Sequence, residues 1–177
     1  MKRPRRALTF GILAAWATTC SLFSGALLAF HLVALPTPAR DDPQLSAALA
    51  AHSDASERAR WHLVHVMYAR CPCSKKIIDH LIARGPMPGV AETVLIVGAD
   101  AALDARVTSA GFSVRDETAT SLREQWHIEA APLFLVADPS GRIRYEGGYT
   151  TVKQGPDIED TAILARAQAS DGDVASL

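Results

Sequence analysis

The stretch Trp61–Leu81, WHLVHVMYARCPCSKKIIDHL, carries the residues that decide the fold and the candidate chemistry. Its first part, His62–Tyr68, is a short apolar run with β-branched valines, which is typical of a buried strand. Further on, apolar residues recur at a helical spacing, at Ile77, Ile78 and Leu81. Cys71 and Cys73 therefore lie where a strand gives way to the N-terminus of a helix, a position that favours a thiolate.

The rest of the chain predicts more strands and helices in alternation. Strands are expected at Thr93–Val97, Phe112–Val114, Leu133–Ala137 and Arg142–Tyr149, and helices at Gln44–Arg60, Ala101–Ala110, Ser121–His127 and Ile158–Ala169. The order begins as strand-helix-strand and ends as a hairpin followed by a helix. This pattern predicts an α/β fold with one mixed sheet flanked by helices on both faces.

The N-terminus is a candidate membrane segment. Basic residues crowd the first six positions, and no Asp, Glu, Lys or Arg occurs from Ala7 to Leu35. This run exceeds the roughly 20 residues that span a bilayer and the apolar core of about 7–15 residues in a cleaved signal peptide. We expect an uncleaved single-pass transmembrane anchor, and a long signal sequence is the alternative. The basic start predicts a cytoplasmic N-terminus and places the following domain in the periplasm or outside the cell, where disulfides persist.

Composition divides the chain into four parts. Residues 1–35 form the basic start and anchor, 36–60 a linker and spacer helix, 61–170 the α/β domain, and 171–177 a loose tail. Prolines in the first part of the linker indicate extended chain. The alanine-rich helix that follows has little to bury, so it is either a spacer or a partly frayed stalk.

Several classes of function find no support in the sequence. The net charge of −1 points to no particular partner, and no basic patch is interleaved with aromatic residues, so we expect no nucleic acid. No phosphate-binding glycine loop, Ser/His/Asp triad or pair of carboxylates can be assembled, and no cofactor is expected.

The segment from Trp61 to Ala169 resembles the thioredoxin superfamily. The resemblance rests on the strand, the Cys71-Pro72-Cys73-Ser74 motif and its helix, and on Ala130-Ala131-Pro132 before the later hairpin. It implies a thioredoxin-like fold, thiol–disulfide oxidoreductase activity on protein clients, and a cis-proline at Pro132 that lies against the reactive thiols. Cis X-Pro bonds are otherwise uncommon, at about 5–6 % in folded proteins.

Two registers relate the motif to the superfamily pattern. The register without a gap puts Cys71 at the attacking position and Ser74 at the place of the second cysteine, so that Cys-x-x-Cys has become Cys-x-x-Ser. The other register aligns the Pro72-Cys73 pair and leaves Arg70 at the nucleophile position. We favour the first, because it keeps the spacing of the strand and the helix. It also puts His65 where many members keep a buried acidic residue that helps proton transfer.

The residues themselves support a thiol nucleophile. A helix N-terminus and the nearby cations of Arg70 and Lys75 both favour the thiolate form of Cys71. Such a thiol attacks disulfides and leaves again readily. Cys73 is expected to resolve the mixed disulfide through a strained Cys-x-Cys ring; without that ring, the domain acts through mixed disulfides, and Ser74 only hydrogen-bonds the thiolate.

The tetrapeptide Cys-Pro-Cys-Ser also resembles the RedB-like branch of thioredoxin-like membrane proteins. The expected function is therefore a membrane-anchored, extracytoplasmic thiol–disulfide oxidoreductase that acts on protein disulfides through Cys71, with Cys73, Ser74 and Pro132 completing the site. The direction of electron flow stays open.

Two other classes of function remain as alternatives. In the first, Cys71 and Cys73 bind copper with a histidine, His65 or His127, as in thioredoxin-fold copper chaperones. The absence of the Cys-x-x-x-Cys motif of those proteins counts against it. The second is a non-catalytic interaction module. For His65 itself, a hydrogen-bonded core histidine is favoured over a ligand or a proton-transfer group.

Overall fold

The structure is a computed structural model of the chain and describes residues 3–32, 38–39, 42–54, 57–150 and 157–170. The chain separates into two compact units, Met1–Leu35 and Pro36–Leu177. The predicted tail, 171–177, lies outside the described residues.

The first unit contains helix α1 (Arg3–Leu32). Its segment Leu8–Leu28 is long and apolar enough to cross a membrane, and none of that segment is buried. Large apolar side chains such as Phe10, Trp16 and Phe23 are exposed along it. An exposed apolar helix of this length is common to membrane anchors and to signal sequences.

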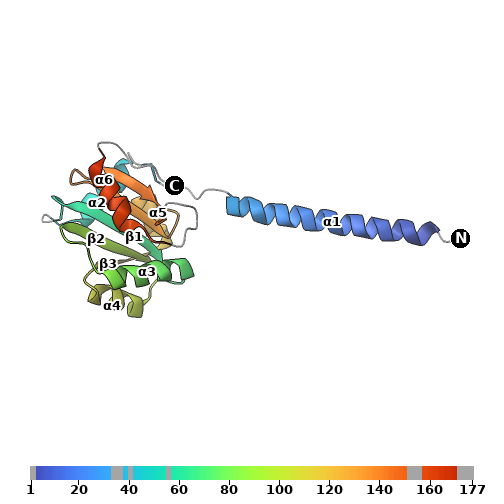
Figure 1. Ribbon diagram of the computed structural model, residues 1–177, viewed down its shortest axis with the longest axis horizontal. Coiled ribbons are helices and arrows are strands. Elements are labelled where there is room, and N and C mark those ends of the chain that lie inside the picture. Colours follow the sequence, from blue (N-terminus) through green and yellow to red (C-terminus); the bar gives the residue numbers. More distant parts are fainter. Residues whose placement is uncertain (1–2, 33–37, 40–41, 55–56, 151–156, 171–177) are drawn as a thin grey trace. The chain divides into compact units, whose positions relative to one another are not determined.

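The second unit is organised around a five-stranded sheet with the order β3-β2-β1-β4-β5 (Figure 1). The strands are β1 (Trp61–Tyr68), β2 (Val90–Val97), β3 (Ser113–Glu117), β4 (Leu133–Ala137) and β5 (Ile143–Gly147). The first three strands are parallel, whereas β4 is antiparallel to both β1 and β5. The predicted mixed sheet is confirmed, and the carboxyl ends of β1, β2 and β3 meet at one edge of the sheet.

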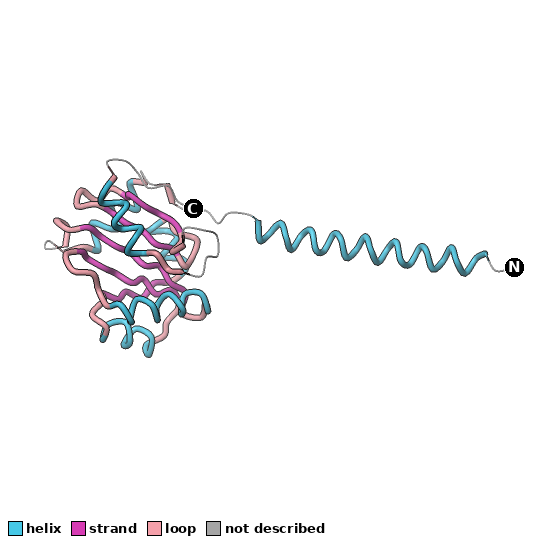
Figure 2. The backbone as a smooth tube through the Cα atoms, in the orientation of Figure 1, coloured by secondary structure: helices cyan, strands magenta, loops and turns pink. Residues whose placement is uncertain are grey.

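Helices cover both faces of this sheet, as predicted (Figure 2). On one face the core includes side chains of α3 (Pro72–Arg84), α4 (Ala101–Ser109) and α6 (Asp160–Ala169). On the other face it includes side chains of α2 (Pro43–His52) and α5 (Ala119–Trp126). Because side chains alternate along a strand, β1 supplies Leu63 and Met67 to the first core and Val64 and Val66 to the second.

Helix α2 corrects the prediction of a spacer with little to bury. Leu45 is 0 % exposed and Leu49 is 5 % exposed, and both belong to the core that contains α5. Asp42 caps the helix by accepting hydrogen bonds from the amides of Gln44 and Leu45. The helix ends at His52, earlier than predicted. Two leucines on one face are enough to bury it, and its alanines do not prevent close packing.

Among the strands whose bounds differ from the prediction, β2 and β3 differ most. β2 begins at Val90, so the strand includes the buried Glu92, which is 7 % exposed. β3 covers Ser113–Glu117, because these residues pair with Thr93–Val97 of β2 although their side chains are mostly polar. Backbone pairing with a neighbouring strand, rather than apolar content, sets both boundaries.

Candidate active site

Cys71 lies at the junction of β1 and α3 and is the N-cap residue of the helix. Its amide donates to the Tyr68 carbonyl at 3.0 Å, and its own carbonyl accepts from the Lys75 amide at 3.0 Å. Pro72 occupies the first helical turn, where the missing N–H has no intrahelical partner to lose. The turn is thus closed on both sides of the cysteine, and the thiol is placed at the positive end of the helix.

The Cys71 thiol is half-buried and free, and its environment favours ionisation. The Ser74 amide is the largest influence and lowers the pKa of the thiol; burial opposes this effect, and the Cys73 amide adds to the lowering. The thiol makes no capping hydrogen bond of regular geometry, so these amides act on the developing negative charge. A thiol activated by helix amides is a nucleophile for disulfides.

Ser74 lies in the first turn of α3, three residues after Cys71, and is fully buried. Its hydroxyl oxygen accepts a hydrogen bond from the Tyr68 amide at 3.0 Å. This contact leaves the hydroxyl proton available for Cys71, and the Ser74 side chain lowers the pKa of the Cys71 thiol further. Ser74 therefore links the end of β1 to the sulfur.

Ser74→Ala is expected to raise the pKa of Cys71 by about one unit, the equivalent of one hydrogen bond to a charged group. The pH dependence of alkylation of Cys71, followed by mass spectrometry, measures the shift. Ser140→Ala is the matched control, because the Ser140 hydroxyl donates to Asp138 within its own turn. An unchanged Cys71 pKa in a folded Ser74→Ala protein would contradict this role.

Cys73 follows in the first turn of α3 and has an exposed side chain. It is a free thiol in the structure, as are Cys71 and Cys20. Only one residue separates Cys73 from Cys71, so the two thiols share one helix terminus. Cys73 is accessible to a partner molecule, whereas Ser74 is not.

Pro132 lies beside the end of β1, and the peptide bond between Ala131 and Pro132 is cis, as the resemblance implied. In the antiparallel pairing of β1 with β4, Val66 faces Leu133. The next residue back along β4 is Pro132, and β1 continues toward Tyr68 and the thiol turn. The cis-proline and the thiol turn thus belong to the same edge of the sheet.

His65 is fully buried in the middle of β1 and is hydrogen-bonded on both sides of its ring. Nδ1 lies 2.9 Å from the Tyr149 hydroxyl, and Nε2 lies 3.2 Å from Oε2 of Glu92. The ring also stacks on Phe134. Burial is the main influence and lowers the pKa of His65, although Glu92 opposes it. The structure records no contact between His65 and Cys71, so the geometry matches a hydrogen-bonded core histidine.

A buried ion network continues from His65 and was missed in the sequence. Arg84 of α3 contacts Glu92 of β2 at 2.6 Å and Asp160 of α6 at 2.8 Å. His80 also lies 3.1 Å from Asp160. Burial opposes ionisation of Glu92, but hydrogen bonds from His65, Arg84 and the Met87 amide lower its pKa to about 2. One signal was present: Glu92 is an acidic residue inside an otherwise apolar strand, VAETVLIV.

The copper hypothesis requires a histidine as a third ligand beside Cys71 and Cys73. Within the described part of the chain, no group of three His, Cys, Asp or Glu side chains could hold a metal ion. His65 is bonded to Tyr149 and Glu92, and His127 pairs with Asp42 at 2.5 Å. Among the described residues, neither histidine therefore joins Cys71 and Cys73 as a third ligand.

A cavity of about 540 Å³ lies at the edge of the sheet that carries the thiol turn. It is lined by the last residues of the three parallel strands, Tyr68, Val97 and Glu117, and by residues that flank or follow them, Arg70, Gly98, Ala99, Asp116, Thr118 and Ala119. Ligands of open α/β sheets bind outside the carboxyl ends of the strands. This cavity therefore has the position expected of a substrate site.

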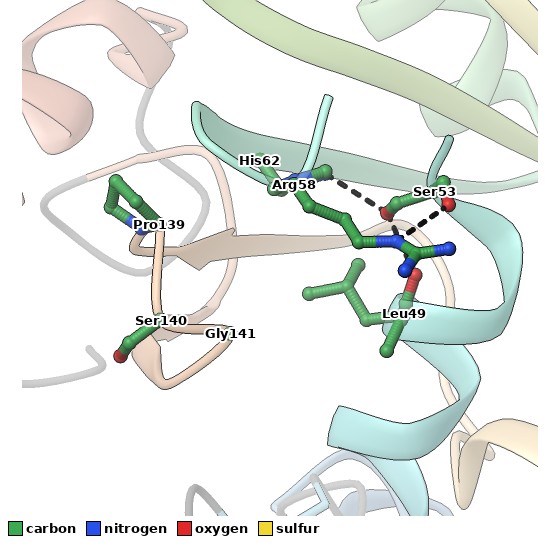
Figure 3. Close-up of a pocket in the computed structure, with 8 residues that line it drawn as sticks. Leu49, Ser53, Arg58, His62, Pro139, Ser140 and Gly141 are labelled. Carbon is green, nitrogen blue, oxygen red and sulfur yellow. Dashed lines mark hydrogen bonds between the residues drawn. The ribbon is translucent and has the colours of Figure 1, made fainter. Parts of the chain in front are cut away.

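A smaller cavity of about 160 Å³ lies at the opposite end of β1, around His62. Figure 3 shows Ser53 joined by hydrogen bonds to both Arg58 and His62 in this cavity. The Ser53 hydroxyl donates to the Leu49 carbonyl at 2.7 Å and lies 3.3 Å from Nδ1 of His62. The hydroxyl proton is already donated to the Leu49 carbonyl at the end of α2, so the contact with His62 does not activate Ser53 as a nucleophile.

The chain is similar in fold to thioredoxin-like proteins of known structure. A Neisseria meningitidis protein provisionally assigned as a thioredoxin matches at 12 % identity, with 67 % of this chain and 83 % of that chain covered and a TM-score of 0.50. A secreted Mycobacterium tuberculosis disulfide oxidoreductase, homologous to Escherichia coli DsbE, matches at 14 % identity over 66 % of this chain and 86 % of that chain, with a TM-score of 0.46.

The thioredoxin domain of a Bacteroides vulgatus thiol-disulfide oxidoreductase matches at 15 % identity over 60 % of this chain and 79 % of that chain, with a TM-score of 0.44. No protein-family model matches the sequence, and a comparison with curated proteins finds no match. At such identities the likeness concerns the fold alone. The chain has a thioredoxin-like α/β fold, with a mixed five-stranded sheet, flanking helices and a long apolar helix at the N-terminus.

Proposed function

We propose that this protein is a membrane-anchored, extracytoplasmic thiol–disulfide oxidoreductase in which Cys71 attacks protein disulfides. One observation carries the proposal: Cys71 is the N-cap residue of α3, and the amides of Ser74 and Cys73 lower the pKa of its thiol. A thiolate at the start of a helix, on a thioredoxin-like fold, is suited to thiol–disulfide exchange.

The proposed reaction is a two-step exchange. In the reductive direction, the Cys71 thiolate attacks one sulfur of a client disulfide; a Cys71–client disulfide forms, and the other client sulfur leaves as a thiolate and takes a proton from water. A second thiol then attacks the Cys71 sulfur and releases the client's remaining thiolate. The client disulfide gains two electrons, and the pair formed by Cys71 and the second thiol loses them. The reverse sequence oxidises a client dithiol.

We assign the second thiol to Cys73. Its exposed position next to Cys71 supports this role, because the resolving sulfur must reach a mixed disulfide at the surface. In the register without a gap, the buried Ser74 takes the place of the second cysteine of the usual Cys-x-x-Cys pattern. Pro132, at the same edge of the sheet, is proposed to shape the groove that receives the client chain.

The proposed location follows from α1. Its apolar segment Leu8–Leu28 and the basic residues before it support a single-pass anchor with the domain in the periplasm or outside the cell. The Cys-Pro-Cys-Ser motif and this helix together support placement in the RedB-like branch.

A redox titration tests the proposal. The full chain in detergent micelles, with Cys20→Ser to remove the third cysteine, is equilibrated in glutathione buffers of increasing potential, quenched with acid and alkylated for mass spectrometry. We expect Cys71 to form a glutathione mixed disulfide or a disulfide with Cys73, the latter at the oxidising end because a Cys-x-Cys ring is strained. If both cysteines stay reduced throughout, the proposal fails and a non-catalytic interaction module remains.

A further inference from the structure

A chain of hydrogen bonds runs from His65 to the start of β4. Nδ1 of His65 lies 2.9 Å from the Tyr149 hydroxyl, and this hydroxyl lies 3.4 Å from the carbonyl oxygen of Leu133. Leu133 is the first residue of β4 and directly follows Pro132, which is proposed to shape the client groove. Pro132 and Leu133 form the groove segment. The Tyr149 hydroxyl therefore lies between a buried titratable ring and the backbone of the groove segment.

The single hydroxyl proton of Tyr149 cannot serve both of its neighbours. The pKa of Glu92 is about 2, so its carboxylate is ionised and only accepts hydrogen bonds. Nε2 of His65, 3.2 Å from that carboxylate, must therefore carry a proton. In neutral His65 the other nitrogen, Nδ1, is then an acceptor and takes the Tyr149 proton. In this state the Leu133 carbonyl receives no hydrogen bond from Tyr149.

A second proton on His65 reverses the direction of this bond. Nδ1–H then donates to the Tyr149 oxygen, and the hydroxyl proton turns to the Leu133 carbonyl. Burial raises the pKa of Tyr149 well above its usual value of 10, so the hydroxyl keeps this proton. With His65 protonated, the contacts of its ring with Glu92 and Tyr149 and the contact of Tyr149 with Leu133 are all hydrogen bonds at once.

The His65 ring faces charged groups from three other elements. They are Glu92 of β2, Arg84 of α3 and Asp160 of α6, and His80 contacts Asp160 at 3.1 Å. Two carboxylates against one guanidinium leave an excess of negative charge, which a second proton on His65 offsets. Burial is the larger influence and lowers the pKa of His65 from 6.5. The second proton is therefore taken up in acid solution, below pH 6.5.

We propose that Tyr149 is a positioning residue for the client groove, because it donates to Leu133 and fixes the groove segment when His65 is protonated. The inference rests on the proposed function and adds its regulation by pH. A groove segment that is already fixed loses less conformational freedom when a client chain binds, so binding is tighter. Attack by Cys71 on a client chain then gains from acid, relative to its attack on a disulfide too small to occupy the groove.

The test compares two substrates of the reduced, full-length Cys20→Ser protein in neutral detergent micelles, from about pH 7.5 to about pH 5, a range that brackets the ordinary pKa of histidine. One is a blocked peptide without ionisable side chains, whose single cysteine carries a chromogenic thiol in a mixed disulfide. The other is a blocked single cysteine with the same chromophore. Attack by Cys71 joins it to the substrate cysteine and releases the chromophore as a thiolate.

The ratio of the two rates cancels the ionisation of Cys71, which affects both substrates equally. We expect the ratio of peptide rate to single-cysteine rate to rise about two- to tenfold on acidification, the range of one hydrogen bond. Nitrogen-15 NMR of the His65 ring gives a readout that needs no variant. It should show a neutral ring with its proton on Nε2 at the alkaline end, and protons on both nitrogens at the acid end.

Two matched variants isolate the hydroxyl. Tyr149→Phe keeps the ring, which stacks on Phe134 at 5.1 Å, and should give a ratio that does not change with pH. Tyr145→Phe should keep the rise, because Tyr145 is also buried but donates to the Gly148 carbonyl at 2.7 Å. A constant ratio in the parent protein, an unchanged rise in Tyr149→Phe, or a neutral ring protonated on Nδ1 overturns the inference while the proposed function stands. No release from either substrate overturns both.

Discussion

Cys71→Ser should reduce mixed-disulfide formation to the background level, whereas Cys73→Ser should leave the first attack intact and accumulate the mixed disulfide. The two residues are neighbours in one helical turn, yet their positions differ. Cys71 caps the helix and has a lowered pKa, and Cys73 is exposed on the first turn. The first attack depends on the Cys71 thiolate, which the helix amides stabilise. Release of the client depends on the Cys73 sulfur.

The measurement is best made at pH 6. A cysteine of ordinary pKa is less than about 1 % thiolate at that pH, so attack reports mainly on an activated thiol. In a Cys20→Ser background, we expect Cys71→Ser to lose more than about 90 % of the trapping rate. Non-reducing electrophoresis and mass spectrometry of acid-quenched samples identify the trapped complex. Equal trapping by wild type and Cys71→Ser would show that Cys71 is not the nucleophile.

Glu92→Gln should destabilise the folded domain by about 3–5 kcal/mol at pH 7, the usual cost of removing one partner from a buried ion pair. The Glu92 side chain is 1 % exposed and contacts both Arg84 and His65. The variant keeps the shape of the side chain but leaves the Arg84 guanidinium with Asp160 as its remaining carboxylate partner among the described contacts. Urea unfolding followed through Trp126, which is 1 % exposed, measures the loss.

The same variant should alter the response to acid. Because the pKa of Glu92 falls from 4.5 to about 2 on folding, its contribution is complete above pH 4.5 and is lost as the pH falls toward 2. Folding also lowers the pKa of His65 from 6.5, so on acidification His65 is protonated in the unfolded chain before it is protonated in the folded domain. Stability therefore begins to fall below pH 6.5. Wild type should therefore lose stability in two stages, and Glu92→Gln should lack the second.

The exposed Glu124→Gln is the control for both measurements, because its carboxylate lies on the surface of α5. It should change neither the urea midpoint at pH 7 nor the difference between pH 4.5 and pH 2. A Glu92→Gln protein as stable as wild type would mean that the buried ion network contributes no net stability.

The fold could be predicted from the sequence because apolar residues recur with different periods in its strands and in its helices. β-branched residues in His62–Tyr68 and helical spacing at Ile77, Ile78 and Leu81 place the thiol turn correctly, and the structure has β1 and α3 on either side of it. The cis bond at Pro132 came from the resemblance rather than from local sequence, since a single proline does not specify its isomer.

Contacts between segments that are distant along the chain could not be predicted from the sequence. Arg84, Glu92 and Asp160 come from α3, β2 and α6, and only the folded sheet with its packed helices brings them together. The cavity at the ends of β1, β2 and β3 depends in the same way on strand order. Helix α2 was underestimated because its two buried leucines are few, and their value depends on a sheet face that the sequence does not show.

Strand β3 has a further consequence for how copies of this protein meet one another. It is the terminal strand of the sheet, and its sequence SVRDE is short, with exposed charged residues at Arg115 and Asp116. Open strand edges invite intermolecular pairing and aggregation, and charged side chains on a short edge oppose it. The charged side chains of β3 are therefore expected to oppose edge-to-edge pairing of neighbouring copies.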